Sequence, residues 1–180
     1  MVINNEVVEP YAAALMSVAQ SNGLTDQFGS DVRSLLGILD SSEELCQFLG
    51  NPLIKPATKK GVLLQVVGDQ VNPYMQNFLK LLVDKGRIAF LEGIGKQYLA
   101  KLRELNQTVL AEVTSAVYLS DAQQDMVRQK VQSMTGARNV ELETKIDPDL
   151  LGGVIIKVGS QVIDSSLRGQ LRRIGIRLAG

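Results

Sequence analysis

The chain has 180 residues, of which 45% are hydrophobic, and its formal net charge is zero. This length and apolar content suffice for one good-sized domain or for two small domains with real cores. A neutral chain lacks the overall positive field by which nucleic-acid-binding proteins attract phosphates, and no run of about twenty apolar residues is present to span a membrane.

The charged residues are unevenly distributed along the chain. Residues 1–50 carry seven acids and one base, and residues 51–103 carry nine bases and three acids. The last sixteen residues carry four arginines and no acid. Such asymmetry suggests docking surfaces, although solvated helix faces are the commoner explanation.

Histidine is absent, and Cys46 is the only cysteine. The chain therefore lacks the usual general base near neutral pH, and Cys46 can form neither an internal disulfide nor a Cys–His pair. We expect Cys46 to be a small apolar residue within a short helix. The lone thiol fits a reducing compartment, and the N-terminal segment has neither signal-peptide nor transit-peptide character, as expected for a bacterial or organelle-encoded chain.

Residues 1–105 have the apolar spacing of helices and predict a bundle of six. A capping box of Ser41 and Glu44 indicates the start of the third helix. Pro56 and Pro73 suit the first turns of the fourth and fifth helices, where a missing N–H is harmless. A long sixth helix then runs to residue 105.

The first and fifth helices are apolar over wider arcs than one core-facing stripe requires. An exposed surplus would form a groove able to accept an amphipathic helix from a partner. The alternative is that both helices are central in the bundle, and periodicity alone favours this alternative. The fourth helix is expected to turn Lys59 and Lys60 toward water.

The pattern changes after residue 105, which predicts a domain boundary between residues 105 and 106. Residues 108–119 favour a long strand because they are rich in β-branched side chains. Ser120 and Gln123 fit a capping box for a following helix, and residues 140–146 alternate as a strand with one wet face.

Residues 151–172 predict a β-hairpin that leads directly into a helix. Gly159-Ser160 suits a type II′ turn, and Asp164 or Ser165 can cap the helix. The apolar side chains of this helix recur at helical spacing. The domain formed by residues 106–180 is therefore β-α-β-β-β-α, and the whole chain is of the α+β class.

Two groups of residues could be mistaken for chemical sites. Gly152-Gly153 and Gly159 belong neither to a P-loop nor to a G-x-G-x-x-G pattern, so a phosphate site is not expected. An acidic group lies nearby, but its spacing does not match an EF-hand, so we expect solvated carboxylates and neither a metal nor a cofactor. Its members are Glu141, Glu143, Asp147 and Asp149.

The final helix has a basic character. Arg168 and Arg172 lie four residues apart on one helix face, where they could bind nucleic acid or an acidic partner helix. Without an aromatic stacking platform or a net positive charge, a protein partner is the better expectation. Two rival functions are a nucleic-acid-binding adaptor that uses this helix and an enzyme, which would need a polar pocket that the sequence does not indicate.

Residues 151–171, LGGVIIKVGSQVIDSSLRGQL, closely resemble the C-terminal signature of the delta subunit of F-type H⁺-transporting ATP synthases, the OSCP/delta family. Residues 11–15, YAAAL, resemble the first-helix motif of the family, in which Arg is more usual at the position of Ala13. Residues 51–52 and 82–87 resemble later landmarks. The resemblance covers essentially the whole chain and is closest to cyanobacterial or plastid-like members.

The resemblance implies a non-catalytic peripheral-stalk (stator) subunit that resists rotor torque during proton-driven ATP synthesis. In the family, the helical domain (residues 1–105) binds N-terminal helices of alpha subunits, and the C-terminal domain (residues 106–180) binds the b-type stalk subunits, b and b′. This implication reverses the preference against a groove. It also implies a peripheral membrane protein without direct membrane insertion, on the cytoplasmic or stromal side of the cell inner membrane or thylakoid.

Carried onto this chain, the resemblance implies two sets of binding residues. The site for the alpha-subunit helix would consist of Tyr11, Ala14, Leu15, Val18, Phe78, Leu79 and Leu82. The site for the stalk would consist of Leu167, Arg168, Leu171, Arg172 and Ile174.

Overall fold

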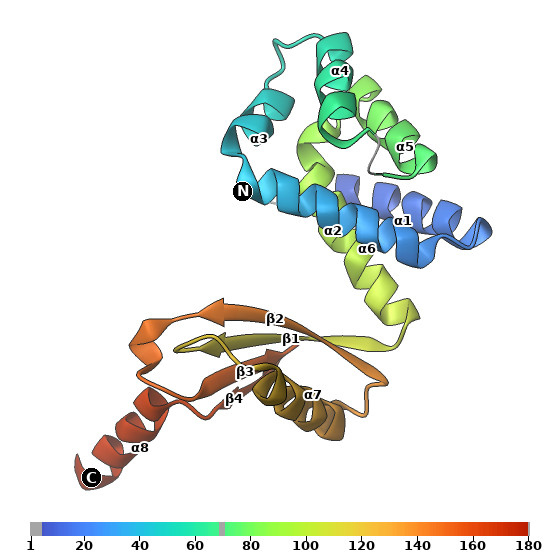
Figure 1. Ribbon diagram of the computed structural model, residues 1–180. Coiled ribbons are helices and arrows are strands. Elements are labelled where there is room, and N and C mark those ends of the chain that lie inside the picture. Colours follow the sequence, from blue (N-terminus) through green and yellow to red (C-terminus); the bar gives the residue numbers. More distant parts are fainter. Residues whose placement is uncertain (1–4, 69–70, 180) are drawn as a thin grey trace. The chain divides into compact units, whose positions relative to one another are not determined.

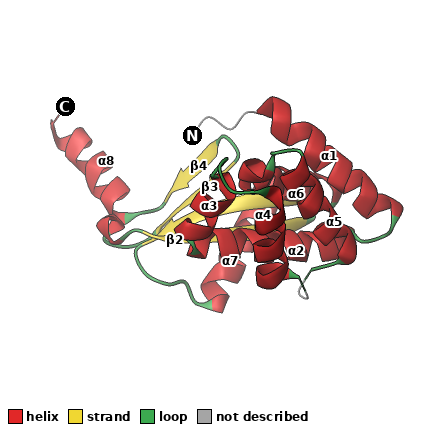
Figure 2. Cartoon of the chain, turned by 90° about the horizontal axis from the view of Figure 1, so that it is seen from above, coloured by secondary structure: helices red, strands yellow, loops and turns green. Residues whose placement is uncertain are grey.

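The computed structural model describes residues 5–68 and 71–179 (Figure 1). The chain divides into two compact units, Met1–Leu102 and Arg103–Gly180. Helices make up the first unit, and every strand in the described residues follows them in the second (Figure 2). The predicted α+β class is confirmed, but the division falls inside the last helix of the first unit and not after residue 105.

The first unit contains α-helices joined by short connections. Their bounds are α1 Asn5–Ser21, α2 Thr25–Ser41, α3 Glu43–Gly50, α4 Pro56–Val67, α5 Pro73–Asp84 and α6 Leu91–Leu105, with a 3-10 turn η1 at Ile88–Phe90. Both predicted proline starts are confirmed. Asn72 caps α5, because its side-chain oxygen accepts the N–H of Tyr74 at 3.0 Å.

The core of the first unit is apolar, and the polar groups within it have partners. Tyr98 is completely buried on α6, and its hydroxyl donates to the carbonyl of Thr25 at 3.1 Å. Burial raises the pKa of Tyr98 to about 12, and the charges of Asp26 and Asp31 act in the same direction. The buried Asp31 carboxylate accepts the N–H of Asn72 at 2.9 Å, so an anion lies where the N-terminus of α5 favours one.

The start of α3 differs from the prediction by one residue. Ser42, and not Ser41, is the N-cap, and its hydroxyl oxygen accepts the N–H of Leu45 at 3.2 Å. The Ser41 hydroxyl instead donates back to the carbonyl of Ile38 within α2. The physical reason is that α2 continues through Ser41, so the chain becomes extended only at Ser42.

Two side chains lie in environments opposite to those expected. Cys46 is exposed, with its thiol directed at the carbonyl of Leu39 at 3.4 Å, because α3 turns Leu49 toward the core in its place. Lys59 is buried, not solvated, and its ammonium donates to the carbonyl of Leu49 at 2.6 Å. Only Lys60 of the lysine pair is directed outward, where it forms an ion pair with Asp84.

The second unit has the predicted order β-α-β-β-β-α. Its elements are β1 Thr108–Ser115, α7 Asp121–Thr135, β2 Asn139–Ile146, a 3-10 turn η2 at Pro148–Leu150, β3 Val154–Val158, β4 Gln161–Asp164 and α8 Leu167–Ala179. The strand order in the sheet is β2-β1-β3-β4. β1 and β2 are parallel and joined through α7, whereas the pairs β1–β3 and β3–β4 are antiparallel.

β1 is shorter than the predicted strand over residues 108–119. Ser115 is the last residue that pairs with β2, and its carbonyl accepts the N–H of Asp147 at 2.8 Å. Its hydroxyl donates to the carbonyl of Val117 at 2.8 Å, which turns the chain out of the sheet. Residues 116–119, including the β-branched Val117, therefore lie in the connection to α7.

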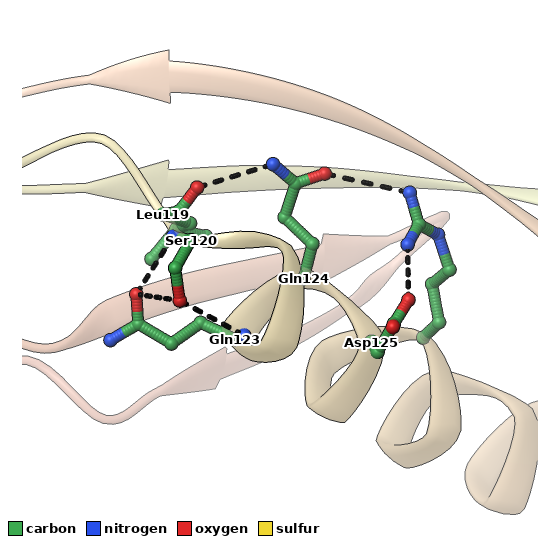
Figure 3. A network of polar contacts seen from close by, with 6 residues as sticks. Leu119, Ser120, Gln123, Gln124 and Asp125 are labelled. Carbon is green, nitrogen blue, oxygen red and sulfur yellow. Dashed lines mark hydrogen bonds and ion pairs between the residues drawn. The ribbon is translucent and has the colours of Figure 1, made fainter.

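The predicted capping box of α7 is confirmed, and Figure 3 shows it within a wider polar network. The Gln123 side chain accepts the N–H of Ser120 at 2.9 Å, while Ser120 Oγ accepts the N–H of Gln123 at 3.4 Å. Gln124 donates to the carbonyl of Leu119 at 3.2 Å. These bonds satisfy backbone groups that the first turn of a helix leaves without partners.

The two faces of the sheet have different chemistry. Val127 and Val131 of α7 pack on one face, against Ala111, Val113 and Ile156. The side chains between these positions on the strands point to the opposite face, as the period of two requires. There Glu112 on β1 and Lys157 on β3 are directly opposed and form an ion pair of 3.1 Å.

The hairpin β3–β4 has the predicted turn at Gly159-Ser160, with φ of +57° at Gly159 and a positive φ at the first position only, as type II′ requires. A tighter constraint lies at Gly153, where φ is +77°. A Cβ atom at this position would lie 2.3 Å from the carbonyl oxygen of Ser165. The backbone before β3 therefore touches the backbone before α8, and only glycine permits this approach.

We predict that Gly153→Ala is far more damaging than the same change at another left-handed glycine. Gly136 has φ of +66°, but a Cβ there would meet no atom within 4 Å. Gly136→Ala should therefore cost about 1 kcal/mol for its backbone conformation alone. Gly153→Ala adds a backbone clash and should cost more than about 3 kcal/mol in urea unfolding followed by circular dichroism. Equal losses in the two variants would contradict the close approach.

Candidate functional site

A groove lined by residues of α1 and α5 is the first candidate site on the first unit. Its volume is about 520 Å³. Apolar side chains dominate its walls, and Asn77 contributes the only amide. The lining residues are Pro10, Tyr11, Ala14, Leu15, Val18, Tyr74, Asn77, Phe78 and Leu81.

The groove exists because α1 has two adjacent apolar faces. Val8, Ala12 and Ala19 are buried in the core of the unit. Tyr11 and Val18 each directly precede a core residue, so they lie about 100° around the helix from the core face. They line the groove, where Val18 remains 41% exposed. Leu15 belongs to both faces, since it is only 3% exposed yet lines the floor of the groove.

On α5 the groove face is displaced by one residue from the predicted one. Leu79 and Leu82 were expected in the groove, but they are 2% and 0% exposed and belong to the core beneath it. Tyr74 and Leu81 line the groove beside Phe78. A stripe at 74, 78 and 81 has the same helical spacing as the core stripe at 75, 79 and 82, so periodicity alone could not separate them.

The side of α1 away from the groove is tied to α6. Glu9 forms an ion pair with Lys101 at 2.6 Å and accepts a hydrogen bond from Gln97 at 2.6 Å. The hydrogen bond from Lys101 is the main reason that the pKa of Glu9 lies below its usual value. These contacts fix α1 from outside the groove, so the groove wall needs no polar bonds of its own.

The groove is suited to binding and offers no means for catalysis. Its polar groups are the amide of Asn77 and the tyrosine hydroxyls, and no carboxylate, lysine or arginine lines it. A wall of this kind can accept the apolar face of a helix, with a few hydrogen bonds to fix its register.

The second candidate site is α8, whose first turn is fixed by a chain of hydrogen bonds. Ser166, and not the predicted Asp164 or Ser165, is the residue that caps the helix: its Oγ accepts the N–H of Gly169 at 3.0 Å. Asp164 holds the capping residue in place. Its Oδ1 accepts both the hydroxyl and the N–H of Ser166, at 2.6 and 2.9 Å.

These bonds also set the charge state of Asp164. The hydrogen bond from the Ser166 hydroxyl, followed by that from the Ser166 N–H, holds the pKa of Asp164 below its usual value. The positive charges of Arg173 and Arg168 act in the same direction. On the other side, the N–H of Leu167 donates to the carbonyl of Gly152 at 3.0 Å, so both flanks of the helix start are held.

Beyond its first turn, α8 extends away from the sheet (Figure 1). The apolar side chains of Leu171, Ile174 and Ile176 are exposed. Leu167, Leu171 and Ile174 share one face, and Leu171 is 60% exposed. Arg168 and Arg172 are exposed beside them, so the structure brings all five predicted stalk-binding residues onto one short helix. A helix with an uncovered apolar stripe indicates a partner.

Glu141, one member of the acidic group on and after β2, forms an ion pair. In the part of the chain that is described, no three His, Cys, Asp or Glu side chains are placed to hold a metal ion. Glu141 instead lies 3.4 Å from Nη1 of Arg103.

Among the described helices, none combines the length and apolar character that crossing a bilayer requires.

We predict that the start of α8 loosens in acid. Folding lowers the pKa of Asp164, so its carboxylate contributes stability above the unfolded pKa of about 3.9 and loses this contribution as the pH falls through the folded pKa. The amide shift of Gly169 in NMR spectra should therefore titrate with a midpoint below about 3.9.

Asp164→Asn should remove this titration, and Asp149→Asn, at an exposed carboxylate in η2, serves as the matched control that leaves it unchanged. A midpoint above the ordinary value for aspartate, or the same titration in Asp164→Asn, would contradict the assignment.

Comparison with known proteins identifies the family. Residues 7–178 match the family described as ATP synthase delta (OSCP) subunit. A protein named ATP synthase subunit delta from Trichodesmium erythraeum (strain IMS101) is 68% identical over 177 residues, which cover 98% of this chain and 97% of that protein. The protein of the same name from Synechocystis sp. (strain ATCC 27184 / PCC 6803 / Kazusa) is 57% identical over 175 residues, covering 97% and 95%.

A solved structure has the same fold. A chain in the cryo-EM structure of the Toxoplasma gondii mitochondrial ATP synthase hexamer superimposes with a TM-score of 0.72 at 23% identity, covering 95% of this chain and 96% of that one. At this identity the likeness concerns the fold alone. The sequence matches carry the assignment, and the chain therefore belongs to the ATP synthase delta (OSCP) subunit family as a non-catalytic component of the peripheral stalk.

Proposed function

We propose that this subunit joins the catalytic head of ATP synthase to the b-type stalk subunits, with one binding surface on each of its two units. The observation that carries the proposal is the open apolar groove between α1 and α5 in a member of this family. The groove binds the N-terminal helix of an alpha subunit. The exposed face of α8 binds the b and b′ subunits.

The shape and chemistry of the groove support a helix as its occupant. Its walls are two helices, and an incoming amphipathic helix can place apolar side chains at every third or fourth residue between them. Tyr11 and Phe78 supply large aromatic surfaces, which commonly dominate binding energy at interfaces. The lack of charged side chains in the lining means that docking leaves no ion unpaired.

The face of α8 supports a protein partner more than a nucleic acid. Arg168 and Arg172 flank an apolar stripe, and such a stripe has no use against a phosphate backbone. A stalk helix with apolar and acidic side chains would cover Leu171 and Ile174 and pair with the arginines.

A stator must hold while the rotor applies torque, so slow dissociation matters more than fast capture. Apolar burial is suited to this task, because it depends less on salt than ion pairing does. As part of the complex, the subunit lies at the periphery of the energy-transducing membrane, on its cytoplasmic or stromal side.

We predict that Ala14→Asp weakens binding of a peptide with the sequence of the alpha-subunit N-terminus. The new carboxylate would be buried without a partner in an apolar groove, so the affinity in isothermal titration calorimetry should fall by more than about tenfold. Ala13→Asp is the matched control, since Ala13 is exposed on the same helix but does not line the groove. No binding by the unaltered protein, or equal binding by both variants, would refute the groove assignment.

We predict that Leu171→Asp weakens binding to purified b-type subunits by more than about tenfold, and that removal of residues 171–180 abolishes it. Gln161→Asp introduces the same charge at an exposed position of β4, outside α8, and should change the affinity little. Circular dichroism should show that the helices of the first unit remain folded in the truncated protein. Normal stalk binding by that protein would be incompatible with the role of α8.

A further inference from the structure

A second pocket in the first unit belongs to neither proposed joint. It has a volume of about 250 Å³ and lies where the chain from α3 to α4 meets the end of α5 and η1. Two prolines and several apolar side chains form most of its walls, together with one charged residue, Lys59. The lining residues are Leu49, Gly50, Pro52, Ile54, Pro56, Lys59, Val83, Gly86, Ile88 and Ala89.

Lys59 is an unusual residue to line an apolar pocket, because its side chain is charged. The residue is only 8% exposed, and no ion pair joins it to a carboxylate in the described residues. Its ammonium makes one hydrogen bond there, to the carbonyl of Leu49 at 2.6 Å in the last turn of α3. An ammonium has three N–H donors, so two are left for another acceptor. Burial of a charge with so little compensation is costly.

The surroundings of the pocket are positive. Lys55 lies between the lining residues Ile54 and Pro56, and Lys85 and Arg87 flank the lining residue Gly86. All three cations are exposed. Asp84, the acid next to this segment, is already paired with Lys60 at 2.6 Å. The mouth of the pocket therefore attracts anions, and the buried ammonium can bind one.

The size of the pocket limits the ligand. Drug-sized ligands occupy pockets of about 300–1,000 Å³, so 250 Å³ suits a smaller body, comparable to one large apolar side chain. A carboxylate is the anion that fits best, because it accepts hydrogen bonds from an ammonium at short distance while its apolar body lies against Ile54 and Ile88.

We propose that this pocket binds a carboxylate joined to a small apolar body, with the carboxylate hydrogen-bonded to Lys59 Nζ. Two sources share this chemistry: a free short-chain fatty acid and the C-terminus of a peptide that ends in an apolar residue. The proposal does not rest on binding of an alpha or b-type subunit.

The test is an NMR titration of the full chain with two pairs of probes. Hexanoate is compared with hexanamide, and N-acetyl-leucine with N-acetyl-leucinamide, so each pair keeps the apolar body and removes the charge. The methyl signals of Ile54 and Ile88 report binding, and that of the fully buried Ile94 is the internal reference. We expect a dissociation constant on the order of 1 mM for the better anion and a preference of at least about tenfold over its amide.

Three variants assign the binding to the pocket. Lys59→Met keeps the apolar stem and removes the ammonium, and should lower the affinity by at least about tenfold. Lys60→Met is its matched control, because Lys60 points to Asp84, and should change the affinity by less than about twofold. Ala89→Phe fills the pocket while Lys59 is kept, so it remains decisive if Lys59→Met does not fold.

Whichever anion binds more tightly identifies the source. The proposal is overturned if neither carboxylate shifts the Ile54 and Ile88 methyl signals, if the amides bind as well as the acids, or if Ala89→Phe leaves the affinity unchanged.

Discussion

The helices α1 and α5 each carry more apolar surface than the core of their own unit can bury. This excess is the constraint on which the first unit depends. One face of each helix closes the core, and the adjacent face is left as the wall of a groove. The two faces are not independent, because Leu15 belongs to both. A partner that fills the groove therefore completes packing that the fold begins, and binding and stability are coupled in this unit.

The second unit has a similar excess, in a different form. The sheet and α7 bury their apolar side chains against one another. The hydrogen bonds that hold α8 lie at its start, apart from one that Arg173 donates to the carbonyl of Asp164, and its apolar stripe stays in water. The contacts that hold this turn involve both backbone groups and the side chains of Asp164 and Ser166. Gly152 and Gly153 allow two chain segments to touch, and Ser166 with Asp164 closes the helix start. The family signature at residues 151–171 therefore contains the glycines and polar residues that fix the start and the direction of α8.

The sequence allowed most helices and strands to be located, because caps, prolines and periodicity agree at places such as Ser120 and Pro73. It was less reliable about the direction of side chains. Leu79 and Leu82 were predicted to line the groove but are buried, because the sequence of an apolar helix does not show which of two adjacent apolar faces packs in the core. Lys59 was expected in water. Its burial depends on a hydrogen bond to a carbonyl of the preceding helix, α3, which the periodicity of α4 does not reveal. Such errors of rotation arise wherever tertiary contacts decide between adjacent faces.

The fixed start of α8 has a consequence for the rate and strength of assembly. A disordered C-terminal segment would lose conformational freedom when it met the stalk, and this loss would weaken the complex. Here the turn is ordered before any partner arrives, so the entropy cost falls on folding and not on binding. Preorganisation of this kind lengthens the residence time of a complex without adding a single contact, which is the property that a joint under continuous load requires.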